Sequence, residues 1–275
     1  MLNKLHAFVM GALLLGVARP AALPSQTTDL RRDTTKTFFT RHDLAYAAEG
    51  VAGTAVVTLF DKSVAHWALQ PGVQGSASRQ RVVKHLTDWS GETTITWASV
   101  LGYGVGRVGH SSAIADVSLH MIEAQALTSV FGQAIRGVLG RARPYVVPDN
   151  AFALHWGQGF THYDYRAFPS LHSAAGFVAA SAITAEMQER NSSATRYVAP
   201  LLYGAALIPG LTRIYNGQHW ASDVVSGAFL GTFFGNRVVR YAHTHAKTKL
   251  DRALLGAAIL PNAGGGVMIA VSIGE

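Results

Sequence analysis

The chain has 275 residues, of which 49% are hydrophobic and 14% are charged, and its formal net charge is +7. This length and composition predict one domain with a sizeable buried core, and the positive charge favours an anionic substrate or an anionic membrane surface. The absence of cysteine excludes disulfides, thiolate metal sites and a cysteine nucleophile. No basic motif interleaved with aromatic residues is present in the sequence, so we expect no nucleic-acid partner.

The N-terminus has the layout of a secretory signal peptide. Lys4 precedes an apolar run from Ala7 to Val17, and small residues suited to cleavage follow it. The run is short for a membrane span, so we predict a signal peptide over residues 1–22 and a polar, flexible segment over residues 23–40. The mature protein is therefore expected outside the cytoplasm, either periplasmic or secreted.

Residues 41–250 are predicted to form one helical domain. Apolar residues at helical spacing predict a helix over 114–140. Other apolar segments predict further helices over residues 41–60, 89–106, 169–187, 198–214 and 218–241. Together with the helix over 114–140 they form an all-α bundle of about six core helices. Glycines at 102, 104 and 106 indicate either close helix packing or a break. Residues 61–80 are polar and carry a Pro71-Gly72 turn, and residues 251–275 are expected to be a tail or a short β-hairpin.

The hydropathy of the chain allows two interpretations of how the protein is placed relative to a membrane. Most apolar segments meet a charge, a glycine or a proline before they reach about 18 residues, the length that spans a bilayer. The mean hydropathy of +0.18 is low for a polytopic protein and high for a soluble one. We expect a soluble or membrane-associated bundle, with an integral membrane protein as the alternative.

A histidine and a carboxylate lie four residues apart in the last helical region, at His219 and Asp223. On one helix this spacing places both side chains on the same face, where they can hydrogen-bond. A carboxylate held against one imidazole nitrogen fixes the tautomer and leaves the other nitrogen as a base, a nucleophile or a metal ligand. An isolated pair of this kind is more often a surface ion pair, so its neighbours decide the interpretation.

Two further groups of residues suit an oxyanion. Arg136 and Arg143 are seven residues apart, so their guanidinium groups would project the same way if the helix continued that far. Guanidinium groups pair bidentately with phosphate oxygens. The stretch Pro169-Ser170-Leu171-His172 opens an apolar segment, where the backbone amides, the Ser170 hydroxyl and the helix dipole favour an anion. Taken singly, these residues also fit helix-end cations and an ordinary N-cap.

Together, the three blocks resemble the signature of the type 2 phosphatidic acid phosphatase superfamily, which also holds bacterial non-specific acid phosphatases and vanadium haloperoxidases. That signature reads Lys-x6-Arg-Pro, Pro-Ser-Gly-His and Ser-Arg-x5-His-x3-Asp. In this chain it stands as Arg136-x6-Arg143-Pro144, Pro169-Ser170-Leu171-His172 and Thr212-Arg213-x5-His219-x3-Asp223. The resemblance covers roughly residues 116–241 and implies the helical bundle of that family.

Three positions depart from the signature. Arg136 replaces a lysine, which keeps the charge and changes a point donor into a planar fork. Thr212 replaces a serine and keeps the hydroxyl. Leu171 replaces a glycine that could serve a positive φ or a close approach of phosphate to the backbone. We interpret Leu171 as narrowing the pocket and tuning the choice of substrate.

The resemblance implies a metal-independent phosphatase that hydrolyses a phosphate monoester or a lipid (pyro)phosphate through a phosphohistidine. It assigns His219 as the nucleophile, Asp223 as the carboxylate that orients it, and His172 as the group that protonates the leaving oxygen and then activates water. It assigns phosphate binding to Arg136, Arg143, Ser170, Leu171 and Arg213. No cofactor is implied, and histidines 110, 120, 155 and 162 are too irregularly spaced to predict a metal cluster.

Three alternatives share the same residues. The pocket could bind vanadate as the cofactor of a haloperoxidase, it could pass the phosphoryl group to an acceptor other than water, or Leu171 could have closed it and left an inactive binding protein. The expected partner is a phosphorylated small molecule or lipid, and the sequence fixes no oligomeric state. The aromatic loop after Arg143, with Trp156 and Tyr163, is expected to select the leaving group.

Overall fold

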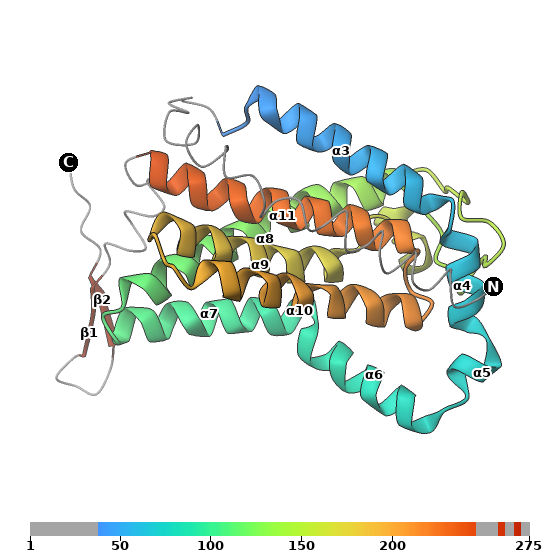
Figure 1. Ribbon diagram of the computed structural model, residues 1–275, viewed down its shortest axis with the longest axis horizontal. Coiled ribbons are helices and arrows are strands. Elements are labelled where there is room, and N and C mark those ends of the chain that lie inside the picture. The colour runs from blue at the N-terminus through green and yellow to red at the C-terminus, as the bar shows by residue number, and fades with distance from the viewer. Residues whose placement is uncertain (1–37, 246–257, 262–266, 271–275) are drawn as a thin grey trace.

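The computed structural model describes residues 38–245, 258–261 and 267–270 (Figure 1). The predicted signal peptide over 1–22 and nearly all of the flexible segment over 23–40 lie outside these ranges. The elements are α3 (Arg41–Thr58), α4 (Asp61–Leu69), α5 (Pro71–Gln74), α6 (Ala77–Ser90), α7 (Glu92–Val108), α8 (Ser112–Leu139), η3 (Gln158–Phe160), η4 (Tyr163–Tyr165), α9 (Leu171–Glu189), α10 (Thr195–Tyr215), α11 (Ala221–Thr244), β1 (Ala258–Pro261) and β2 (Val267–Ala270).

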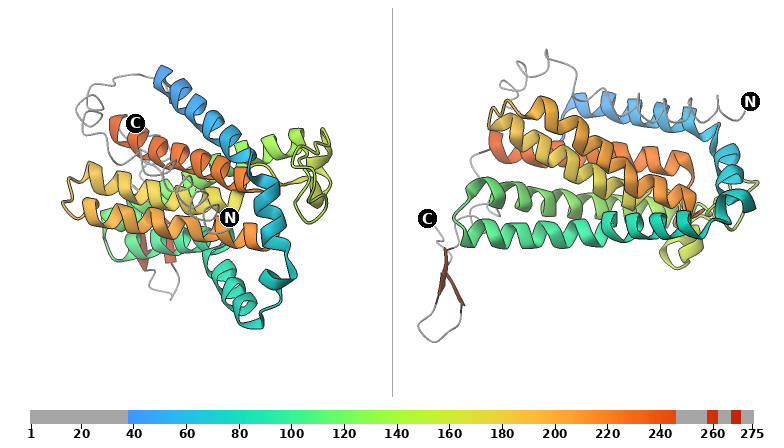
Figure 2. Two further views of the ribbon diagram at one scale, coloured as in Figure 1. Left: turned by 45° about the vertical axis from the view of Figure 1, so that its right-hand side comes forward. Right: turned by 60° about the horizontal axis from the view of Figure 1, so that its bottom comes forward.

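Helix α9 is the centre of the bundle. It contacts α8, α10 and α11, while α7 packs along α8 and α3 lies along the outside of α11 (Figures 1 and 2). Phe177 and Ala180 of α9 share a buried cluster with Ala206 of α10 and Ala228 of α11. A helix that is apolar on every side is a core helix, and the all-α bundle predicted from the sequence is confirmed.

Glycines on α11 allow it to pack closely against α9. A Cβ added at Gly227 would collide with the backbone carbonyl of Ser170, and one added at Gly231 would collide with the carbonyl of Ala174. The first turns of both helices are also joined, because the Ser170 amide donates to the carbonyl oxygen of Asp223 at 2.9 Å. Two blocks of the sequence signature are thereby fixed side by side.

Helix α7 runs without interruption through the three glycines that left its continuity open. A Cβ at Gly102 would lie 2.6 Å from Ser118 Oγ, and one at Gly106 would lie 2.5 Å from the Ala115 amide nitrogen. Both neighbours belong to α8, so these glycines serve close helix packing and do not break the helix.

The region expected to be a polar turn is largely helical. Helix α4 occupies Asp61–Leu69, and Pro71 is the first residue of the short α5, a position where its missing N–H costs no hydrogen bond. Helix α6 begins after Ser76, whose side chain accepts a hydrogen bond from the Arg79 amide. Because this stretch is polar in composition, the sequence analysis did not predict its three helices.

Of the two alternatives for residues 251–275, a tail or a short β-hairpin, the strand pairing fits the hairpin. β1 and β2 are antiparallel, with Ala258 opposite Ala270, and the expected turn over 262–266 lies outside the described residues. In the part of the chain that the structure describes, α10 (Thr195–Tyr215) is the one helix long and apolar enough to cross a membrane by length and composition.

The close contact of α9 and α11 predicts opposite effects for two glycine substitutions. Gly231→Ala forces the two helices apart, so we expect a loss of about 1–3 kcal/mol in the free energy of unfolding. Gly104 has no atom within 4 Å of an added Cβ, so Gly104→Ala should stabilise α7 by roughly 0.5–1 kcal/mol. Urea unfolding measures both, and equal midpoints for the two variants would contradict this packing.

Candidate active site

The three sequence blocks meet at one end of the bundle, where α8 and α10 end and α9 and α11 begin (Figure 1). Arg136 lies in the last turn of α8, His172 in the first turn of α9, and Arg213 in the last turn of α10. His219 lies in the connection from α10 to α11, and the ring centroids of His172 and His219 are 6.5 Å apart. The structure thus brings the two predicted catalytic histidines together.

Arg136 and Arg143 reach the site from different elements, because the helix does not continue far enough for both to project from it. Helix α8 ends at Leu139 because Gly140 is left-handed, with φ 58°, and a Cβ there would collide with the His155 carbonyl. Arg136 is buried and its Nε donates to the Pro169 carbonyl oxygen at 2.8 Å. Arg143 belongs to the loop that follows.

Loop groups hold Arg143 and Arg213 without neutralising them. Arg143 Nε donates to the Tyr163 carbonyl oxygen at 3.0 Å, and its guanidinium lies 4.1 Å from the centre of the Tyr163 ring. The side-chain oxygen of Gln218 accepts from Arg143 Nη1 at 3.1 Å and from Arg213 Nη2 at 3.3 Å. These partners are uncharged, so the positive charge of both arginines remains available to an anion.

No carboxylate forms an ion pair with Arg136, Arg143 or Arg213 among the described residues. Burial lowers the pKa of Arg136 to about 10, and the Arg143 charge adds to that effect. Three cations at one buried location oppose each other unless an anion joins them. This arrangement is suited to a tetrahedral oxyanion.

His219 is held in one tautomer by the backbone. It is 1% exposed, and its Nδ1 lies 2.7 Å from the Ala167 carbonyl oxygen, which can only accept a hydrogen bond. Nδ1 therefore carries the proton and Nε2 carries the lone pair. Burial, followed by the charges of Arg136 and Arg143, lowers the pKa of His219 well below its ordinary value. The result is a neutral imidazole with Nε2 available as a nucleophile.

His172 is also neutral. Burial is the first cause and the Arg213 charge the second, and together with His219 and the other arginines they lower the pKa of His172 to about 3. Its Nδ1 has no hydrogen-bond partner among the described residues. The same is true of three other buried nitrogens of this site, Arg136 Nη2, Arg213 Nε and His219 Nε2. Unpartnered buried polar atoms are uncommon, and these four belong to the two histidines and to two of the arginines whose charges lower the histidine pKa values.

Asp223 occupies a different position from the one expected. His219 and Asp223 do not share a helix face, because α11 begins at Ala221 and His219 precedes it. Asp223 Oδ2 accepts from the Trp220 amide at 2.7 Å and lies 3.6 Å from His219 Nδ1, whose hydrogen bond goes to Ala167. The carboxylate caps its own helix, and it acts on His219 through its negative charge, without a hydrogen bond.

Sequence reasoning missed the partner that holds Asp223. Arg141 Nη1 donates to Asp223 Oδ1 at 2.5 Å and to Ser222 Oγ at 2.8 Å, and Arg141 Nη2 donates to Asp61 Oδ2 at 2.8 Å. Asp61 lies at the start of α4 and is fully buried. Burial lowers the pKa of Arg141, but Asp223 and Asp61 outweigh this and raise it above its ordinary value. Arg141 could have been noticed as a third arginine inside the first block, whereas no sequence spacing points to Asp61.

Ser170 and Leu171 start α9. The Ser170 side chain accepts from the Ser173 amide at 3.4 Å, and its own amide is committed to the Asp223 carbonyl. Leu171 is 2% exposed and its side chain packs against Gly132 of α8. It has an ordinary helical backbone, so no positive φ is required where the family signature has glycine. The first-turn amides of Leu171 and His172 have no partner within the helix.

The aromatic loop contributes unequally to the site. Tyr163 stacks on Arg143, and its hydroxyl lies 3.2 Å from Gln218 Oε1 and 3.4 Å from Arg213 Nη2. Trp156 is 66% exposed. Of the two aromatic residues expected to select the leaving group, Tyr163 touches the arginine cluster.

Comparisons with known proteins concern the family and the fold. The model of the PAP2 superfamily matches residues 117–247, the span that contains all three blocks. A solved structure described as the first transmembrane PAP2 type phosphatidylglycerolphosphate phosphatase from Bacillus subtilis matches with a TM-score of 0.53 and 18% sequence identity. The match covers 73% of this chain and 95% of that chain, and at this identity it shows a shared fold. No curated protein matches the chain.

The Arg141 contacts predict a positioning role that acts through Asp223. In Arg141→Lys the charge remains but one ammonium cannot serve both carboxylates, so the start of α11 shifts relative to Ala167. We expect kcat to fall about 10- to 100-fold, with a smaller change in KM. Arg196→Lys is the matched control, because Arg196 is exposed and stacks on Tyr197. Steady-state kinetics on both folded variants measure the effect. Equal kcat values for the two variants would refute this role.

Proposed function

We propose, from the match of residues 117–247 to the model of the PAP2 superfamily, that the chain is a phosphatase acting on a phosphate monoester or a lipid (pyro)phosphate. One observation carries the proposal: three arginines without carboxylate partners surround two neutral histidines, one of which has an unpartnered Nε2. The positive field complements the equatorial oxygens of a phosphoryl group, and the imidazole supplies a nucleophile.

In the first step we propose that His219 Nε2 attacks phosphorus while the ester oxygen departs from the opposite side. The Ala167 carbonyl keeps the proton on His219 Nδ1, and Asp223 stabilises the positive charge that develops on the ring. Arg136, Arg143 and Arg213 neutralise the equatorial oxygens as charge moves. The leaving oxygen takes a proton from His172.

In the second step His172, having given up its proton, accepts one from a water molecule. The resulting hydroxide attacks phosphorus, the bond between phosphorus and His219 Nε2 breaks, and inorganic phosphate leaves. His172 is neutral before substrate binds, so the proton used in the first step arrives with the phosphate monoanion or is taken up as the anion offsets the arginine charges. This chemistry uses no divalent ion, because the guanidinium groups fill that electrostatic role.

Exposed apolar residues support a lipid substrate. On α7, Trp97, Leu101, Val105 and Val108 follow each other at helical spacing, and each is more than 60% exposed. Such an apolar stripe is typical of a surface that contacts a membrane or a partner. With the signal-like segment over residues 1–22, it supports a mature enzyme that works outside the cytoplasm, associated with a membrane surface.

The proposed nucleophile predicts a metal-independent activity that depends on His219. The mature chain, assayed with EDTA throughout, should release phosphate from an aryl phosphate and from a phosphatidate or polyprenyl-pyrophosphate micelle. His219→Ala should lower the rate by at least about 1,000-fold, because a covalent route is lost. His66→Ala is the control, since His66 is exposed and pairs with Asp149. Release that persists in His219→Ala would contradict the proposal; the absence of release from either substrate would favour the vanadate or inactive alternatives.

The low pKa values of the histidines predict an acidic pH profile. His172 stays neutral in the free enzyme down to about pH 3, and the lowered pKa of His219 keeps that imidazole neutral well below its ordinary range. A phosphate monoester loses its second proton near pH 6, and with it the proton needed by the leaving group. We therefore expect kcat/KM to be high between roughly pH 4 and 6 and to fall as the pH rises above about 6. A kcat/KM that increases from pH 6 to 8 would show that a histidine must first lose a proton.

A further inference from the structure

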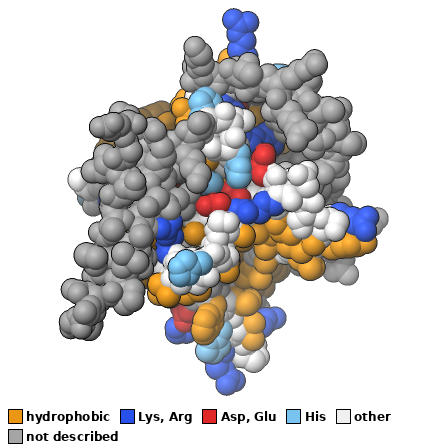
Figure 3. Space-filling view, turned by 90° about the vertical axis from the view of Figure 1, so that its left-hand side faces the viewer, with side chains coloured by type: hydrophobic (Ala, Val, Ile, Leu, Met, Phe, Trp, Pro, Cys, Tyr) orange, Lys and Arg blue, Asp and Glu red, His pale blue; other side chains and the backbone are white. Residues whose placement is uncertain are grey.

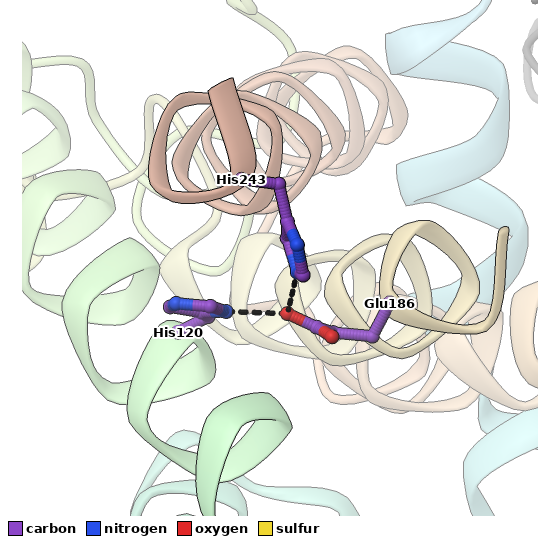
Figure 4. Close-up of side chains that lie close together, drawn as sticks. All are labelled: His120, Glu186 and His243. Atoms are coloured by element: carbon purple, nitrogen blue, oxygen red, sulfur yellow. Dashed lines mark hydrogen bonds and ion pairs between the residues drawn. The ribbon is translucent and has the colours of Figure 1, made fainter. Parts of the chain in front are cut away.

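A second cluster of ionisable side chains lies at the opposite end of the bundle. His120 of α8, Glu186 of α9 and His243 of α11 point toward one another, and both histidines contact the same carboxylate oxygen (Figure 4). Glu186 is fifteen residues along α9 from Leu171, which places the cluster about 22 Å from the active-site end of that helix. The proposed phosphatase reaction does not use these residues.

The distances suit a small metal ion. Glu186 Oε1 lies 2.5 Å from His120 Nδ1 and 3.1 Å from His243 Nε2, and the ligand atoms of all three residues lie within 4.8 Å of one another. Around a tetrahedral zinc ion, nitrogen and oxygen ligands stand about 3.3 Å apart. The imidazoles would retreat from the carboxylate by less than about 1 Å to admit the ion.

The surrounding charges favour a cation. Glu186 Oε2 has Arg190 Nε at 3.4 Å, and Arg190 Nη2 is held by Asp116 Oδ2 at 2.7 Å. With neutral imidazoles, Glu186, Arg190 and Asp116 leave one net negative charge. The site therefore attracts positive charge, either as a proton or as a metal ion.

The cluster combines buried ligands with an opening to solvent. The His120 and Glu186 side chains are 4% and 3% exposed, whereas the His243 side chain is 31% exposed. Figure 3 looks onto this end of the bundle and shows histidine, acidic and basic side chains gathered at the surface. An ion could enter past His243 and keep a water molecule as its fourth ligand.

We propose that His120, Glu186 and His243 bind one divalent transition-metal ion of the zinc type, joining the far ends of α8, α9 and α11. Two imidazoles and one carboxylate select such an ion over magnesium or calcium, which prefer oxygen ligands. No spacing in the sequence indicates this site. Of histidines 110, 120, 155 and 162, His120 alone enters such a group among the described residues, and its partners are far away in the chain.

The test is direct metal binding by the mature chain after treatment with EDTA and dialysis. Zn²⁺ is titrated by calorimetry, and Co²⁺ is followed by its visible absorption, which reports coordination by imidazole. We expect one strong site per chain, together with a rise in Tm on adding Zn²⁺. His243→Ala is the main variant because its exposed position tolerates truncation, and Glu186→Gln is the second. His66→Ala, which removes an exposed histidine elsewhere, is the control.

Loss of a ligand should weaken binding at least as much as loss of an outer partner does, about tenfold or more. The expected result is therefore at least about tenfold weaker Zn²⁺ binding in folded His243→Ala and Glu186→Gln, no Tm rise in either, and unchanged binding in His66→Ala. Absence of strong binding in the wild type, or equal binding in His243→Ala, would overturn the site and leave a hydrogen-bonded His–Glu–His cluster. Phosphate release at low temperature should be unaffected by His243→Ala, so the two proposals fail independently.

Discussion

The buried contact between Arg141 and Asp223 is the interaction on which the geometry of the active site depends. Through its two terminal nitrogens Arg141 joins Asp223 of α11 to Asp61 of α4, and its Nε holds the Ala151 carbonyl of the loop. Removing one member of such a network leaves an uncompensated buried charge, which typically costs about 3–5 kcal/mol. The network therefore does more than link elements: it fixes where α11 begins, and so where the residues just before that helix can lie.

The arginines of this region divide into two kinds. Arg141 is neutralised by two carboxylates, whereas Arg136, Arg143 and Arg213 meet carbonyl, amide and phenol groups. The second kind keeps its charge for a ligand, and that charge, together with burial, holds both histidines neutral. Because these three arginines are not neutralised by carboxylates, the nucleophile His219 stays unprotonated in acid. At the far end of the bundle the charge balance is reversed, because the carboxylates of Glu186 and Asp116 outnumber the one guanidinium of Arg190 and favour a cation.

The sequence predicted more of the fold than of the site. Apolar spacing located α8 to α11 within a few residues, and three short blocks identified the residues that meet at one end of the bundle. Three-dimensional contacts decided the rest. The left-handed Gly140 ends α8 and moves Arg143 off the helix, Ala167 takes the hydrogen bond that Asp223 was expected to make, and Leu171 finds room beside Gly132. Partners more than 60 residues apart, such as His120 and Glu186, have no signature in a single sequence.

The central claim is that Nε2 of His219 forms a bond to phosphorus, and trapping that bond tests it most directly. The mature chain is mixed with an activated aryl phosphate, quenched in alkali within the first turnover, and digested for mass spectrometry. The account predicts phosphate on the peptide that contains His219, stable in alkali and lost in acid, with more of it in His172→Ala because the water step is slowed. Phosphate on another residue, or turnover without a phosphorylated peptide, would contradict the account.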